Sequence, residues 1–314
     1  MTYYKVSSIE FEVAAKPYAN MSSHKQIDVT QDIMQQLPGE VVAHIASFTE
    51  KKDLNNLRLA SSDAAAKSSI EFAKQNLKHL HVNIRIQDDD STDFGRFDLS
   101  DIEDALKIIE DNNRASFVEE VTFGDNLDWD STPYISPDQV FGSREMTKTR
   151  TLLMTLFSKL TSIRKVSFAF NFEPFTDFLM RALEDSKHLQ LTSLNLCHGG
   201  LMHAYDLSQV LRTFSKTLRS LHLHNHSLRW NEWQAILENV RDDLQIEEFS
   251  IKSAIVKQSM YHPNLLDFKA SSNDHDPDLP EGESYCFEWD SVVMVGKTAV
   301  KRSTQMLLIM LPGY

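Results

Sequence analysis

Short stretches of alternating apolar and polar residues recur along the chain from residue 77 onward. Each follows the pattern L-x-x-L-x-L, where L is a large apolar residue, and the copies start at Leu77, Val118, Ile163, Leu191, Leu218 and Ile246. The last four starts are spaced by 28, 27 and 28 residues. A period of two is typical of a strand that is buried on one face. The even spacing of these strands predicts a repeat architecture.

The segments between the later copies have the apolar spacing of helices. In residues 175–183, 207–214 and 230–240, apolar residues recur at intervals of three and four, which places them on one side of a helix. A strand, an asparagine turn and a returning helix make the unit of a leucine-rich repeat, and residues 118–126 and 163–171 fit its first part in full. We therefore predict an α/β fold in which residues 77–314 form an irregular leucine-rich-repeat solenoid of about six repeats.

Three longer segments interrupt this spacing, near residues 87–117, 127–150 and 271–284. The first combines an acidic loop with one amphipathic helix, and the third has the composition of an acidic surface loop. Insertions in repeat proteins often lie on the binding face. The first two are therefore candidates for partner contact, with a neutral surface loop as the alternative. Residues 285–295 are predicted to form one closing strand.

The region before the repeats has a different pattern. Residues 37–60 predict two short amphipathic helices, and Val41, Ile45 and Phe48 fall on one face of the first. Two such helices carry more apolar surface than they can bury between themselves. Either the rest of the chain or a partner protein must cover it. Residues 1–26 have no regular period and are predicted to be a leader segment.

The sequence of this helical region, LPGEVVAHIASFTEKKDLNNLRLAS, resembles the F-box, the motif that docks substrate receptors onto a Skp-type adaptor in cullin-based ubiquitin ligases. The resemblance covers residues 27–72. The chain departs from the family pattern at residues 60–66, which are rich in Ala and Ser where the family often has Val-Ser/Cys-Arg and a tryptophan. Residues 218–251 are similar to the repeats of F-box proteins from filamentous fungi.

This resemblance implies an N-terminal F-box-like helical module and the function of a substrate-recognition receptor in a Skp–cullin–F-box ubiquitin ligase. The module would bind the adaptor and the repeats would bind the target protein. By the resemblance, the residues that would meet the adaptor are Leu37, Pro38, Val41, Ile45, Leu54 and Leu57. Some of these must instead hold the module's own core, and the sequence does not distinguish the two roles.

Polar residues alternate with the apolar strand positions and would face the concave side of a solenoid. The predicted target-binding residues are His79, His81, Lys165, Ser167, Asn195, Cys197, His222, His224, Glu248 and Ser250. The alternatives are a polar wall without a single task and a soft-metal site that joins Cys197 to the histidines of the next strand. We favour protein contact or a plain polar wall, and we expect no metal.

Composition narrows the classes of partner. The net charge of −13 opposes nucleic acid and anionic membranes. Two cysteines and no apolar leader suit the reducing cytoplasm or nucleus. Motifs for phosphate loops, nucleophile elbows and zinc proteases do not occur in the sequence. We therefore predict a non-enzyme without a cofactor, whose partners are the adaptor, a cullin reached through it, and a target protein. The alternative is a leucine-rich-repeat scaffold with no ligase role.

Overall fold

The computed structural model describes residues 36–88, 95–125, 143–169, 173–197, 204–257, 263–265, 278–288 and 291–310. The predicted leader, residues 27–35 of the F-box-like segment, most of the segment 127–150 and residues 271–277 lie outside this described part. The two asparagine turns at Asn126 and Asn171 also lie outside it.

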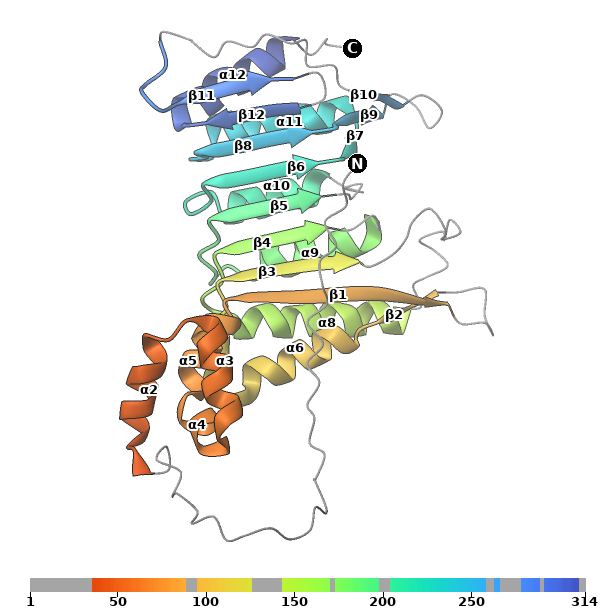
Figure 1. Cartoon of the computed structure of the whole chain (residues 1–314). Helices are drawn as coiled ribbons and strands as arrows, with labels where there is room; N and C mark the ends of the chain where they lie inside the picture. Colours follow the sequence, from red (N-terminus) through yellow and green to blue (C-terminus); the bar gives the residue numbers. More distant parts are fainter. Residues whose placement is uncertain are drawn as a thin grey trace.

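In the described residues, the N-terminal module contains four short helices, which lie together beside the β1 end of the sheet (Figure 1). Its first two helices confirm the elements that the sequence predicted in residues 37–60. In the core of the module, α2 and α3 each contact α4 and α5, and Ser61 caps α4 by accepting a hydrogen bond from the backbone of Ala64 at 3.4 Å. The four helices are α2 (Gly39–Ser47), α3 (Lys51–Ala60), α4 (Ser62–Lys67) and α5 (Ser69–Asn76).

One mostly parallel sheet forms the centre of the molecule. Each predicted strand pairs in parallel with the next copy of the pattern, because every copy buries its two alternating apolar residues on the same side. The parallel strands are β1 (His79–Asp88), β3 (Glu120–Asp125), β4 (Lys165–Ala169), β5 (Ser193–Cys197), β6 (Ser220–His224) and β8 (Glu248–Lys252).

Antiparallel strands close the sheet at both ends. At one end β2 (Gly95–Asp98) pairs with β1, and at the other β12 (Ser291–Val295) pairs with β8 and β11 (Ser284–Phe287) pairs with β12. The order across the sheet is β11-β12-β8-β6-β5-β4-β3-β1-β2. The single closing strand predicted for residues 285–295 was therefore wrong: the segment forms a hairpin of two strands.

A row of helices covers one side of the sheet (Figure 1), and each helix contacts the next one in the row. The apolar core lies between the two layers, with Phe123 at its centre, its ring 5.8 Å from that of Phe157 and 5.5 Å from that of Phe168. This alternation of strands and helices confirms the predicted α/β class. The helices are α6 (Ser100–Glu110), α8 (Ser143–Lys159), α9 (Glu173–Asp185), α10 (Ala204–Thr213), α11 (Trp230–Asp242) and α12 (Lys297–Met310).

Two of the predicted insertions contain regular structure that belongs to the main architecture. Residues 87–117 hold the end of β1, strand β2, helix α6 and the 3-10 helix η1 (Asp111–Phe117). The segment 127–150 runs into α8, which starts at Ser143. Both α6 and α8 are members of the helical row. These two ranges therefore include parts of the regular strand-and-helix architecture as well as any inserted loop.

A second, three-stranded sheet lies at the C-terminal ends of the later parallel strands, and the sequence did not predict it. It has the order β10-β9-β7 and consists of β7 (Ser227–Leu228), β9 (Ile255–Lys257) and β10 (Pro263–Leu265). The indole nitrogen of the buried Trp233 donates a hydrogen bond to the carbonyl of Ile255 at 3.2 Å, which ties this small sheet to α11.

Candidate functional site

The first candidate surface is the outer face of helix α2. The side chains of Val41 and Ile45 are 42% and 43% exposed, and Phe48, directly after the helix, is 79% exposed. The inner face of the same helix buries Val42 and Ala46. Helix α2 therefore carries apolar side chains on both faces, and those of the outer face meet water, which is typical of a protein-binding surface.

The structure divides the six predicted adaptor residues into three groups by their exposure. Val41, Ile45 and Pro38 are exposed, whereas Leu37 and Leu57 are half-buried. Leu54 is completely buried among the module helices. Leu54 therefore belongs to the core of the module, the role that the sequence left open for some of the six residues. The helical period alone does not distinguish an inner leucine from an outer one, because both keep the same spacing.

Polar contacts inside the module hold α2 in place. The ammonium of Lys67 donates to the carbonyl of Leu37 at 2.8 Å, just before α2 begins. The guanidinium of Arg58 donates to the carbonyl of Ala65 at 2.7 Å and lies 4.1 Å from the centre of the Phe72 ring. The module meets the main body where α5 contacts η1. The exposed stripe of α2 is thus presented by a braced scaffold.

The second candidate surface is the side of the sheet that faces away from the helices, here called the polar face. All ten predicted target-binding residues lie at non-core strand positions that form aligned rows across it. The row through the middle of the strands reads His81, Thr122, Ser167, Asn195, His222 and Ser250. Equivalent positions in successive copies of the sequence pattern therefore lie side by side across the sheet.

Hydrogen bonds link the polar side chains of β5, β6 and β8. Ser220 donates to Glu248 at 3.2 Å and contacts Nε2 of His222 at 2.8 Å. The Oγ atom of Ser250 lies 2.7 Å from Nδ1 of His222 and 3.2 Å from Nε2 of His224. These side chains hold one another in fixed rotamers, which lowers the entropy lost when a partner binds.

The thiol of Cys197 continues this network without gaining reactivity. Its Sγ atom lies 3.5 Å from Nδ1 of His224 and donates to Oδ1 of Asn195 at 3.1 Å. Burial raises the pKa of the Cys197 thiol, and the hydrogen bond with Asn195 opposes that rise only in part. A thiol with a raised pKa is a poor nucleophile. Within the described ranges, no three His, Cys, Asp or Glu side chains group as metal ligands.

The histidines of the polar face should make stability depend on pH. Burial lowers the pKa of His222 below its ordinary value of 6.5, with Glu248 opposing the effect; burial and then His81 lower the pKa of His79. The unfolded chain therefore takes up protons first as pH falls through 6.5, and the free energy of unfolding decreases. We expect the midpoint temperature of thermal unfolding to decrease as the pH is lowered from about 7.5 to about 5.

His222→Gln should make that fall smaller, because it removes an imidazole whose pKa is lowered by burial in the folded chain. Thermal unfolding followed by circular dichroism across the pH range measures the slope. Equal slopes in the wild type and in His222→Gln would show that His222 does not contribute.

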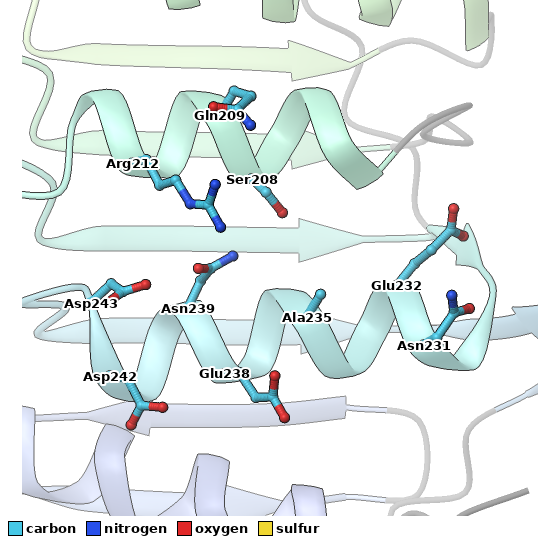
Figure 2. A pocket seen from close by; sticks show the side chains of 10 residues that line it. All are labelled: Ser208, Gln209, Arg212, Asn231, Glu232, Ala235, Glu238, Asn239, Asp242 and Asp243. Carbon is cyan, nitrogen blue, oxygen red and sulfur yellow. The ribbon is translucent and has the colours of Figure 1, made fainter.

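A groove lies on the opposite, helical side of the molecule, between α10 and α11 (Figure 2). It has a volume of about 550 Å³ and is lined mainly by polar and acidic side chains. Ser208 and Asn239 line it from positions that are largely buried, and Arg212 reaches in from α10. The lining lacks the apolar character of a typical small-molecule pocket.

Sequence reasoning missed two residues of the polar face, Val293 and Val295. They are 43% and 41% exposed, while their neighbours Val292 and Met294 are buried. The signal was the period of two within residues 291–295, but four adjacent apolar residues also suit a strand that is buried on both sides.

Comparisons with known proteins add no family to this description. A scan against protein-family models found no match, and a search of the curated proteins found none either. Of the helices that the structure describes, none has the length and apolar character needed to span a bilayer.

Proposed function

We propose that this protein is the substrate-recognition receptor of a Skp–cullin–F-box ubiquitin ligase. The observation that carries the proposal is the exposed apolar stripe of α2, with Val41, Ile45 and Phe48 facing water from a braced helical module. This stripe lies within the segment that resembles an F-box. The occupant that we assign to it is a Skp-type adaptor, which would connect the chain to a cullin.

We further propose that the main body is an irregular leucine-rich-repeat solenoid. The successive strands pair in parallel in chain order, and their returning helices lie on one side. The steps of 27 and 28 residues between the later strands fall within the range of leucine-rich repeats. In such a solenoid the polar face would be the concave side and would bind the target protein.

The chain would do no chemistry in this role. It would hold a target protein close to the ubiquitin-conjugating enzyme, so that the transfer to a target lysine takes place at a high effective concentration. The proposed setting is the cytoplasm or nucleus, with no metal, cofactor, nucleic acid or membrane as partner.

A leucine-rich-repeat scaffold without a ligase role is the second candidate. One observation favours it, the departure from the F-box pattern at residues 60–66. A scaffold of this kind, with its helical module packed on its own first repeat, would bury the outer face of α2. Val41 and Ile45 are instead exposed, which favours the receptor.

Charged substitutions on α2 should abolish adaptor binding. In the double variant Val41→Asp, Ile45→Asp, two carboxylates would have to be desolvated in an apolar interface, which costs far more than the contact gains. We expect the wild-type chain to co-elute with a co-expressed Skp-type adaptor in size-exclusion chromatography, and the double variant to elute alone.

The matched control is Ile309→Asp, which changes an apolar side chain that is 73% exposed on α12. It should keep the adaptor. Circular dichroism of each variant verifies that the helices remain folded. A wild-type chain that ignores the adaptor, or a double variant that still binds it, would contradict the proposal and leave the scaffold function.

A further inference from the structure

An apolar spot interrupts the polar face at its C-terminal end. Strand β12 pairs antiparallel with β8, so that Val293 lies opposite Ser250 and Val295 opposite Glu248. Directly opposed residues in such a pair project to the same side of the sheet. Both valines are therefore on the polar face, and each is more than two-fifths exposed.

This spot is distinctive within the described part of the face. The other large apolar side chains that the structure shows as exposed lie on the N-terminal module or on the helices, as with Met154 on α8 and Ile309 on α12. A contact made on the polar face can therefore bury exposed valine surface only at β12. Apolar anchors near the centre of a contact usually supply most of its binding energy.

Two opposite charges lie on strand β8 beside the spot, with Glu248 directly opposite Val295 and Lys252 one step beyond Ser250 on the same side. Glu248, Ser250 and Lys252 share one side of this strand because they are two residues apart. At the usual rise along a strand, the Cα atoms of Glu248 and Lys252 are about 13 Å apart. Within the described residues, no lysine or arginine pairs with the Glu248 carboxylate and no carboxylate pairs with the Lys252 ammonium.

The acidic end of this arrangement is fixed before any partner arrives. The carboxylate of Glu248 accepts a hydrogen bond from Ser220, and its Oε1 lies 3.8 Å from Nε2 of His222. Ser250, beside Val293, is held by both histidines of β6. The hydrogen-bond donors, acceptors and charges of this surface are therefore oriented before a target binds. Such a surface favours binding of target segments with one particular sequence over nonspecific binding of many.

We infer that the β8–β12 end of the polar face anchors one short segment of the target protein. The segment would place an apolar side chain on Val293 and Val295, a lysine or arginine beside Glu248 and an aspartate or glutamate beside Lys252. Residues four apart in an extended segment span the 13 Å between these charges, to within about an ångström. This inference rests on the proposed target-binding role of the polar face and names the chemistry that this face selects.

The test is selection from a displayed library of random peptides against the full chain bound to its adaptor, with the adaptor alone as the subtraction. We expect enriched peptides to carry a basic residue, an apolar residue and an acidic residue in that order or its reverse. The double variant Val293→Asp, Val295→Asp should bind a synthetic copy of an enriched peptide about tenfold more weakly or worse. Met154→Asp, a matched change on the helical side, should bind it as well as the wild type.

A charge exchange gives the sharper result. A synthetic copy of a peptide enriched on the wild type should bind Glu248→Lys, Lys252→Glu about tenfold more weakly or worse, and the same peptide with its basic and acidic residues exchanged should regain binding to this variant. Glu120→Lys on β3 should bind the original peptide as well as the wild type. No enrichment over the adaptor alone, or enriched peptides that bind all variants equally, would overturn the inference. If the chain ignores the adaptor, the same selection is run on the chain alone, so that failure of the receptor function and failure of this site are told apart.

Discussion

Gly296→Ala should lower the free energy of unfolding by about 3 kcal/mol, through two costs that act together. Gly296 has a φ of +98°, in the region that side-chain-bearing residues rarely adopt. A Cβ at this position would also overlap the side chain of Glu283. Glu283 in turn accepts a hydrogen bond from the backbone of Ala299 at 2.8 Å in the first turn of α12. Moving Glu283 therefore removes a cap as well as relieving the overlap.

The chain offers a matched control in Gly282, which has a φ of +84° but no atom within 4 Å of an added Cβ. Gly282→Ala should cost only the backbone term, about 1 kcal/mol. Urea denaturation followed by circular dichroism measures both variants. Equal losses of stability would show that the overlap with Glu283 is relieved at no cost, contrary to this prediction.

Phe123→Ala should cost about 3–5 kcal/mol, because it leaves a cavity that the surrounding structure fills only partly. Phe123 is completely buried on β3, and its ring meets those of Phe157 from α8 and Phe168 from β4. Three elements that are distant in the sequence lose packing at once. The loss should therefore appear as a lower denaturation midpoint of the whole sheet.

The same substitution at an exposed site serves as the control. It distinguishes the stability lost by removing a buried ring from any effect of removing a phenyl group in general. Phe48→Ala removes a ring that is 79% exposed and should change the stability of the free chain by no more than about 0.5 kcal/mol. If the proposed receptor function holds, Phe48→Ala should weaken adaptor binding while it leaves the urea midpoint in place. A similar loss of stability in both variants would mean that Phe48 packs in solution against a surface that the structure shows as open.

The sequence was a good guide to the sheet because its signal is local. The alternation around Leu194 and Leu196, or around Leu221 and Leu223, is a property of adjacent residues, and equal steps then set the register of one strand on the next. The equivalent positions Asn195, His222 and Ser250 lie side by side for this reason.

The remaining features depend on contacts between distant segments. Residues 285–295 form two strands because the chain reverses where the backbones of Glu288 and Ser291 exchange hydrogen bonds. The second of these strands then pairs with the distant β8, a contact that the local pattern does not contain. The sorting of α2 into an inner and an outer face depends on α4 and α5, which pack against the face that holds Val42 and Ala46 and leave Ile45 exposed. Tertiary packing of this kind overrides a periodic pattern that fits both arrangements.

The reversed direction of β12 limits how far the sheet can grow. Each earlier strand offers its neighbour a parallel edge, to which a further repeat or a second molecule could add. β12 runs the other way against β8, and β11, only four residues long, forms the final edge. Short edge strands are a known defence against uncontrolled association between sheets. Removing this hairpin from an otherwise intact chain would expose the full edge of β8, and the foreseeable result is fibrous or amorphous self-assembly rather than a shorter soluble protein.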